Sequence, residues 1–362
     1  MLYKSITGVK SCDTFLSFQL FEKGVEPLTI CPREKWEATE EAFIGPYGVL
    51  AKRSAGRPHE EEPCHIRTCF QRDVDRITHS KAFRRLKHKT QVFLEPEGDH
   101  YRTRLTHTLE VTRIARAIAR ALALNEDLTE AIGLGHDLGH TPFGHAGERA
   151  LRVIYAEGFH HYEQSLRVVD RIEKSGRGLN LTHETRMGIL HHTTGHPDDC
   201  CEAVAVRLAD KIAYINHDID DAIRAGLLTT ADLPQVVRER IGDRHSVRIN
   251  TILEDLIRTS TDGVLRFSAG MSEAIDVFHS FLFERVYLNP TAKSEESKVE
   301  NILRGIWEYY VNHPEKLPAD YKLIAETEGI DRAVCDYVSG MTDKYAAYQY
   351  SELFIPAAWQ VR

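Results

Sequence analysis

Apolar side chains recur at helical spacing along most of this chain, whereas strictly alternating apolar and polar positions are scarce. The clearest example is the segment 201–225, where aliphatic residues recur every three or four positions before Gly226. That spacing places them on one face of a helix. The pattern predicts an all-α fold, in which residues 91–95 form a short strand and the β structure amounts to a short hairpin at most.

Signals at the segment ends support further helices. The segment 104–124 carries an apolar stripe, and Asn125 marks the start of the next helix because its side chain can accept hydrogen bonds from free backbone amides. The stripe comprises Leu109, Ile114, Ala115, Ile118 and Leu122. Other periodic segments predict helices near 72–89, 145–157, 162–175, 183–192, 233–241, 247–260, 270–288, 294–312 and 330–352.

The beginning of the chain differs from the rest. Residues 1–33 have weak periodicity and are expected to form an N-terminal extension. Residues 34–64 carry proline, glycine and mixed charge, which predicts loops and short helical turns.

Charge narrows the classes of partner. A net charge of −8 argues against binding nucleic acid over the whole surface. Basic residues nevertheless gather in the segment 67–89, which has eight Lys or Arg and only two acidic residues. This local excess suits an anionic small molecule or a phosphate chain, and a solvated basic helix face explains it equally well.

Targeting signals are not evident. No run approaches the roughly 18 apolar residues that a membrane span requires, and the N-terminus does not resemble a signal peptide. The seven cysteines include no CxxC pair, which indicates reduced thiols. We therefore expect a cytoplasmic protein that does not bind membranes.

The stretch from His136 to Glu148 concentrates candidate chemistry. It contains three histidines, an aspartate and a glutamate among glycines and a proline. Adjacent His136 and Asp137 offer one nitrogen and one oxygen ligand, a pair suited to a divalent metal of intermediate hardness. The glycines and the proline end the preceding helix and turn the chain, so that His145 and Glu148 can face the same point. The stretch predicts a metal-dependent hydrolase site.

A second His-Asp pair, His217-Asp218, lies inside the long segment 201–225. At about 100° per residue, Tyr214 and Asp218 share one side of that helix with Asp210. Isoleucines flank this polar side closely, which favours a helix that lines an internal cleft over one that faces solvent.

These residues together resemble the HD-superfamily metal phosphohydrolases, and within them the bacterial dGTPase-like branch of the deoxynucleoside triphosphate triphosphohydrolases. The motifs that carry the resemblance are Phe70–Asp73, His79–Gln91, Gly98–His107, His136–Glu148 and Asp210–Tyr214. It implies a multi-helix HD architecture, with a dNTP triphosphohydrolase domain over 34–362. That domain would comprise an HD core at about 100–226 and a helical C-terminal part at 227–362.

The resemblance also implies a role for individual residues. The implied metal ligands are His107, His136, Asp137 and Asp210. The implied catalytic pair is His145 and Glu148, which their spacing of three places on one helix face; a helix-capping pair is the alternative. The implied phosphate contacts are Arg104, Lys211 and Tyr214, and the implied contacts to the sugar 3′-hydroxyl are Gln91 and Asp218.

The implied reaction is hydrolysis of deoxynucleoside triphosphates, dGTP or several dNTPs, to deoxynucleoside and tripolyphosphate. It would use one divalent ion per site, and mixed ligation does not choose among Mg, Mn, Fe, Co and Ni. His145 could act as general acid or as nucleophile. The alternatives are another HD phosphohydrolase, acting on a nucleoside monophosphate, a cyclic nucleotide or guanosine tetraphosphate, and a non-catalytic nucleotide- or single-strand-binding module.

Other histidines and partners stay open at this point. The pairs His160-His161 and His191-His192 could supply further ligands, although core or exposed histidines are the commoner case. His140 could contact a phosphate or brace the turn. The resemblance also implies a homo-oligomer, and weak binding of single-stranded nucleic acid is compatible with it.

Overall fold

The computed structural model describes residues 31–91, 102–288 and 296–356. Within these ranges the chain is helical, and its β structure consists of two isolated antiparallel bridges, Thr90–Thr103 and Thr261–Val264. The prediction of an all-α fold is confirmed. Of the strand predicted at 91–95, all but Gln91 lies outside the described residues. No described helix is both long and apolar enough to cross a bilayer.

The helices divide into three stretches of the chain. The first is α2 (Pro32–Phe43), α3 (Cys69–Thr78), α4 (Lys81–Arg85), α5 (Arg104–Ala121) and α6 (Glu126–Gly135). The second is α7 (Gly144–Ile154), α8 (His161–Arg167), α9 (Glu173–Gly176), α10 (His183–His191) and α11 (Cys201–Arg224). The third is α12 (Gln235–Arg240), α13 (His245–Thr259), α14 (Ala269–Leu282), α16 (Glu296–Asn312), α17 (Ala319–Glu328), α18 (Ile330–Ser339) and α19 (Asp343–Phe354).

Helix starts follow the capping signals closely. Asn125 accepts hydrogen bonds from the amides of Asp127 and Leu128 at 3.0 and 3.1 Å and so begins α6 as predicted. Ser80 does the same for α4 through the amide of Phe83 (3.1 Å). That second cap divides the single helix predicted over 72–89 into α3 and α4.

Three other segments depart from the sequence-based predictions. Residues 32–43 form a helix, α2, where an extension and then loops were expected, and the proposed boundary at residue 33 falls inside it. The segment 330–352 is two helices, separated around Gly340. In the helix predicted over 104–124, Leu109 is 46% exposed, because α5 buries the face of Val111, Ala115 and Ile118 instead.

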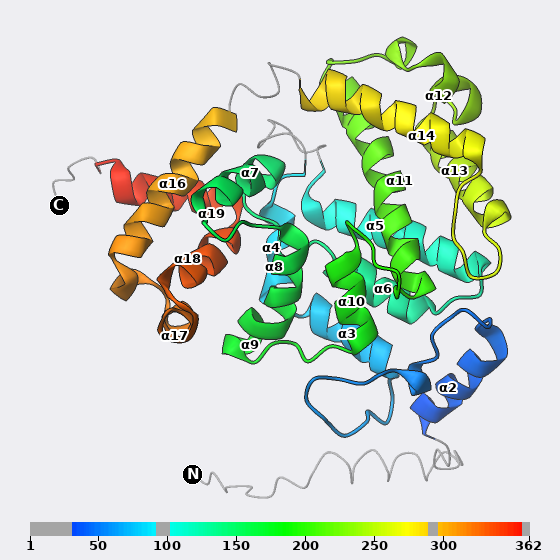
Figure 1. The fold of residues 1–362 in the computed structure, drawn as a ribbon, viewed down its shortest axis with the longest axis horizontal. Helices are drawn as coiled ribbons and strands as arrows, with labels where there is room; N and C mark the ends of the chain where they lie inside the picture. The colour runs from blue at the N-terminus through cyan, green and yellow to red at the C-terminus, as the bar shows by residue number, and fades with distance from the viewer. Residues whose placement is uncertain (1–30, 92–101, 289–295, 357–362) are drawn as a thin grey trace, which may run out of the picture.

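The long helix α11 packs against α5 and α6 and forms the centre of the larger apolar core, which extends to α13 and α14. A second core joins α7 to the C-terminal helices α16–α19. In Figure 1 the orange and red C-terminal helices lie on one side, the yellow-green helices α11–α14 on the other, and α7 and α8 stand between them. The two cores therefore meet around α7.

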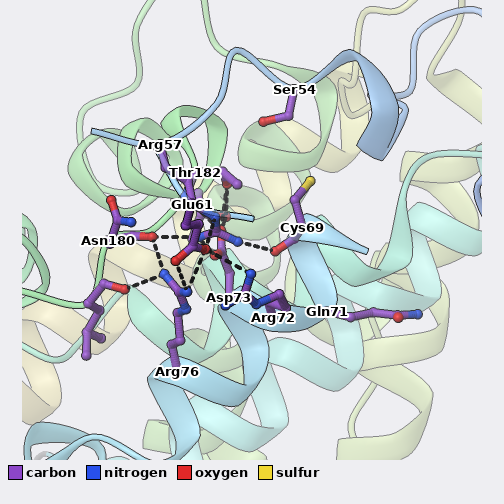
Figure 2. Close-up of polar contacts among 12 residues, drawn as sticks. Ser54, Arg57, Glu61, Cys69, Gln71, Arg72, Asp73, Arg76, Asn180 and Thr182 are labelled. Atoms are coloured by element: carbon purple, nitrogen blue, oxygen red, sulfur yellow. Dashed lines mark hydrogen bonds and ion pairs between the residues drawn. The ribbon is translucent and has the colours of Figure 1, made fainter. Parts of the chain in front are cut away.

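A buried ionic cluster fastens the loop after α2 to α3 (Figure 2). Asp73 is fully buried, and its Oδ1 accepts a hydrogen bond from Arg57 at 2.5 Å. Its Oδ2 accepts from the amide and hydroxyl of Thr182 and from the hydroxyl of Thr185 at 2.6–2.9 Å. Glu61 pairs with Arg57 and with two further arginines, Arg72 and Arg76. We call this the Asp73 cluster; two arginines of the basic segment 67–89 thus have their charges paired inside the chain.

Candidate active site

The chain turns sharply between α6 and α7, and this turn carries much of the candidate chemistry. It enters α7 through Phe143 and Gly144, whose φ angles are 63° and 55°. A non-glycine residue in this left-handed region costs about 1 kcal/mol or more. At Gly139 in the same turn, a Cβ atom would lie 2.1 Å from the amide nitrogen of Ser165 on α8, so only glycine fits there. We call residues 138–145 the catalytic turn.

Two histidines and two carboxylates meet where α5, α6 and α11 converge. His107 Nε2 lies 3.0 Å from Asp210 Oδ1. Ligand atoms of His107, His136 and Asp137 all lie within 4.8 Å of one another. The structure therefore brings together, from three helices, the four residues expected as metal ligands.

The atoms of this cluster fit a divalent cation. His136 Nδ1 donates to the carbonyl of Gly133 at 2.7 Å, so its Nε2 carries a lone pair, and that buried nitrogen has no hydrogen-bond partner. Burial alone would raise the pKa of Asp137, but the neighbouring His136 and Arg104 hold it well below its usual value. Likewise, the hydrogen bond with His107 outweighs burial and lowers the pKa of Asp210 to about 2. A free imidazole nitrogen beside two ionised carboxylates is a donor set that a borderline cation prefers.

A cavity of about 500 Å³ opens beside this cluster. Its wall comes from α5, α7, α8, α11, α14 and the turn that follows α14. Most of the predicted site residues line it: Gln91, Arg104, His107, Asp137, His145, Glu148, Asp210, Tyr214 and Asp218. His136 lies behind the wall, where it is fully buried.

Arg104 is almost completely buried at the start of α5. Its Nη1 donates to Asp137 Oδ2 at 2.7 Å. Its Nε and Nη2 are buried and have no hydrogen-bond partner. A guanidinium with two unused N–H groups at a cavity wall can bind an anion there, because planar N–H pairs match phosphate and carboxylate oxygens.

The expected catalytic pair is close together but is not joined as the sequence suggested. His145 is exposed to the cavity, yet the surrounding walls limit its hydration and, with the Arg104 charge, lower its pKa to about 4. Glu148 instead accepts from His161 Nδ1 at 3.0 Å and from the His161 amide at 3.3 Å. Although Glu148 is largely buried, its bond with His161 lowers its pKa to about 2. Glu148 therefore orients His161 and acts on His145 only through its charge.

His161 is the most informative residue that the sequence left open. Its ring stacks on His140 at 4.1 Å between centroids, and its Nε2 lies 3.2 Å from His192 Nε2. Asp137, His140 and His161 also bring ligand atoms within 4.8 Å of one another. By contrast, His191 pairs with Asp199 away from this group. The site thus extends from the metal cluster along a row of imidazoles to α8 and α10.

The other group of predicted residues contains unused polar atoms. Gln91 Oε1 and Asp218 Oδ1 are buried and have no hydrogen-bond partner. Asp218 Oδ2 accepts from the hydroxyl of Tyr287, and burial raises the pKa of Asp218 to about 7. Tyr287, together with His279, Phe283 and Val286, lines the cavity from the α14 side. No sequence pattern had singled out these four residues.

One predicted phosphate contact lies elsewhere. Lys211 is not part of the cavity wall; its ammonium group contacts Asp276 Oδ1 on α14 at 3.2 Å. Helix geometry explains the difference, because Lys211 stands about 100° around α11 from Asp210.

Comparison with known proteins agrees with this geometry. Residues 104–215 match the model of the HD domain family, and residues 265–352 match that of the phosphohydrolase-associated domain. The first match contains all four residues of the metal cluster.

Whole-length relatives extend the comparison. A deoxyguanosinetriphosphate triphosphohydrolase-like protein of Caldanaerobacter subterraneus subsp. tengcongensis is 53% identical over 328 residues, covering 90% of this chain and 97% of the relative. Proteins of the same description from Clostridium perfringens and Desulfatibacillum aliphaticivorans are 47% and 46% identical, and each comparison covers 90% of this chain and 98% of the relative. With a helical fold and a His/Asp cluster suited to a metal, the chain is a phosphohydrolase that belongs to the deoxyguanosinetriphosphate triphosphohydrolase-like family of HD-domain proteins.

Proposed function

We propose that the protein hydrolyses deoxynucleoside triphosphates, dGTP or several dNTPs, to deoxynucleoside and tripolyphosphate. The observation that carries this proposal is one cavity that holds both the metal cluster and unused polar atoms suited to phosphate and sugar. Its volume of about 500 Å³ falls in the range of about 300–1,000 Å³ that small-molecule sites occupy. The names of the relatives point to the same substrate class.

The metal cluster and Arg104 account for the phosphate end. When bound by His107, His136, Asp137 and Asp210, a divalent cation supplies Lewis acidity and neutralises charge at the α-phosphate. The Nε and Nη2 groups of Arg104, which lack partners, are available to donate to phosphate oxygens. Such preorganised donors act strongly inside a cavity with little water.

His145 is assigned the proton of the leaving group. Cleavage between the α-phosphorus and O5′ expels an alkoxide, which needs a proton as it departs. In the free protein the pKa of His145 is about 4. A triphosphate bound beside it raises that pKa, because an opposite charge favours the protonated imidazole. Substrate binding thereby helps to prepare the acid.

The sugar end is assigned to the residues on the other part of the wall. Asp218 and Gln91 have buried oxygen atoms without partners, and the 3′-hydroxyl of a deoxyribose can donate to either. Tyr214 and Tyr287 line the cavity near Asp218 and offer apolar ring surface against a sugar.

The test is turnover of metal-reconstituted protein with the four dNTPs and the four NTPs, with tripolyphosphate identified directly. His145→Ala should lower kcat by about 10²- to 10⁴-fold, the usual contribution of a general acid, and should keep nucleotide binding. His313→Ala, at an exposed histidine outside the cavity, is the matched control and should behave as wild type. Inorganic phosphate as the sole product, or turnover of a nucleoside monophosphate, a cyclic nucleotide or guanosine tetraphosphate in place of dNTPs, would contradict the proposal. Unchanged turnover by His145→Ala would remove the acid assignment.

A further inference from the structure

The catalytic turn is held from outside the HD-matched segment, by residues at the ends of α18 and α19. Asp343, the first residue of α19, is 2% exposed. Its Oδ1 accepts a hydrogen bond from the amide of Phe143 at 2.8 Å, and its Oδ2 accepts from the amide of Thr90 at 2.8 Å. One carboxylate thus joins two backbone segments that are separated by more than fifty residues in the sequence.

Each of these two amides lies next to a site residue. Thr90 precedes Gln91, and Phe143 is two residues before His145. Phe143 is also the residue with a left-handed backbone at the start of α7, and that helix has no side-chain cap of its own. The Asp343 carboxylate therefore bonds to the turn at its strained position.

Lys89 supports the same turn from a second direction. Its side chain is buried, and its ammonium group donates to the carbonyls of His140 in the turn and of Ser339, the last residue of α18 (2.9 Å to the latter). Its own carbonyl accepts from the amide of Arg104 at 3.1 Å. Lys89 thus connects the turn and the start of α5 to the C-terminal helices.

The packing around the turn leaves little room for it to move. A Cβ atom on Gly144 would lie 3.2–3.3 Å from the carbonyl oxygens of Thr90 and Gln91. The turn and the segment that carries Gln91 are consequently in direct backbone contact, and the Asp343 carboxylate closes the same junction. A shift of one of these segments would displace the other.

We propose that Asp343 is a positioning residue for catalysis: its carboxylate, supported by Lys89, fixes the catalytic turn relative to Gln91, so that the C-terminal helices set the geometry of the active site. Asp343 itself does not line the cavity. Displacement of reacting groups by about 1 Å can lower a rate by about 100-fold. The C-terminal segment then serves the chemistry as well as the stability of the fold.

The decisive comparison pairs Asp343→Asn with Glu173→Gln. An amide can accept only on its oxygen, so Asp343→Asn loses one of the two backbone hydrogen bonds and sets an NH₂ group against an N–H. Glu173 is the matched control: it is 5% exposed, and it accepts from the amides of Lys81 and Ala82 at 3.1 and 2.7 Å, one on each oxygen. It caps α4 and does not line the cavity.

For Asp343→Asn we expect kcat to fall by about 10- to 100-fold, with KM and bound metal per chain within about twofold of wild type. For Glu173→Gln we expect an equal or larger loss of Tm with kcat within about twofold. Equal kcat values in the two variants, or a loss of kcat that follows the loss of bound metal, would overturn the proposal. Because this comparison uses dNTP turnover, it rests on the proposed function.

Amide hydrogen exchange tests the brace without any substrate. Asp343→Asn should accelerate exchange in peptides that contain residues 138–147 and 88–91, whereas Glu173→Gln should accelerate it only around residues 81–82. Unchanged exchange at the turn would refute the brace, even in a protein that hydrolyses dNTPs. Wild-type protein inactive on every dNTP would instead refute the proposed function and leave the exchange result to decide the brace.

Lys89→Met provides a second variant if Asp343→Asn does not fold. It removes the donations to the His140 and Ser339 carbonyls without leaving a buried charge, and we expect a loss of kcat in the same range. The double variant should lose less than the product of the two single losses, because residues that hold one element are not independent. Fully multiplicative losses would show that the two residues act separately and would contradict a common brace.

Discussion

Two buried aspartates, Asp73 and Asp137, stand in clusters of similar composition and very different completeness. Both oxygens of Asp73 are bonded, and none of the buried side-chain polar atoms described in its cluster lacks a partner. Around Asp137, by contrast, buried nitrogens of Arg104, His107, His136 and His140 have no partner. Buried polar atoms without partners are costly. A chain that leaves several of them in one place has reserved them for a ligand.

The contrast yields a general way to separate structural from functional polar clusters. In a complete cluster every donor has its acceptor, so removing a member should cost stability and leave the chemistry unchanged. In an incomplete cluster the missing partner comes from outside, so removing a member should cost function first. The following predictions test that distinction, from the largest expected effect to the smallest.

His136→Ala should lower turnover by about 10³-fold or more, because Lewis-acid stabilisation is worth several kcal/mol and about 1.36 kcal/mol corresponds to a factor of ten. Bound metal per chain should fall in parallel. Initial rates and elemental analysis of the purified variant check both expectations. Full metal content with full activity would show that the imidazole is only structural.

Asp73→Ala should have the opposite profile. It leaves the Arg57 guanidinium buried without its carboxylate, and removing one partner of a buried pair costs about 3–5 kcal/mol. We expect urea unfolding to reveal a loss near the lower end of that range, because Glu61 still contacts Arg57. Turnover per folded molecule should stay within about twofold of wild type. A large fall in turnover at unchanged stability would break the distinction between the two clusters.

Asp218 makes the stability of the open site depend on pH. Burial raises the pKa of this carboxyl to about 7 in the folded protein, whereas the unfolded value is near 4. The folded state therefore holds the proton between about pH 4 and 7, and this stabilisation is lost as the pH rises through 7.

The measurement is urea unfolding of chelator-treated Asp218→Asn and wild type at pH 5 and pH 8. The stability of the variant relative to wild type should increase by about 2 kcal/mol between these values, since one pKa unit corresponds to about 1.36 kcal/mol. His145 and His192, whose pKa values burial lowers to about 4 and 3, destabilise both proteins equally as the pH falls below 6.5. A difference that does not change with pH would contradict the assigned protonation.

Thr185→Val is the smallest of these changes. It removes one hydroxyl donor to Asp73 Oδ2 and leaves two others in place. The expected loss of stability is about 1 kcal/mol, the usual net value of one hydrogen bond, with no change in kcat. Thermal unfolding and steady-state kinetics of the variant provide the check. A loss above about 3 kcal/mol would mean that the Asp73 cluster acts as one cooperative unit.

Local features of the sequence predicted much of this architecture. Helical spacing placed Asp210, Tyr214 and Asp218 on one side of α11, and the three now line the cavity together. Capping chemistry located the start of α6 at Asn125. These successes share a cause: the interacting groups lie within a few residues of one another, where backbone geometry alone fixes their relation.

The rest depends on contacts between distant segments. Glu148 bonds His161, thirteen residues away across a loop, and Tyr287 reaches Asp218 from the turn after α14. No periodicity encodes either pairing, because both depend on how helices dock. The assignment of Lys211 to phosphate came from resemblance, and helix geometry weakens it, since Lys211 points to Asp276 on the neighbouring helix.

The spacing along α11 has a consequence for how this protein can change. Asp210, Tyr214 and Asp218 succeed one another every fourth residue over two turns of an uninterrupted helix. Inserting a single residue between Asp210 and Asp218 would rotate everything beyond it by about 100° and carry Asp218 out of the cavity. Loops on either side of α11 can lengthen freely, whereas its register between these aspartates cannot drift. Deep mutational scanning with single-residue insertions should find this stretch intolerant from one end to the other.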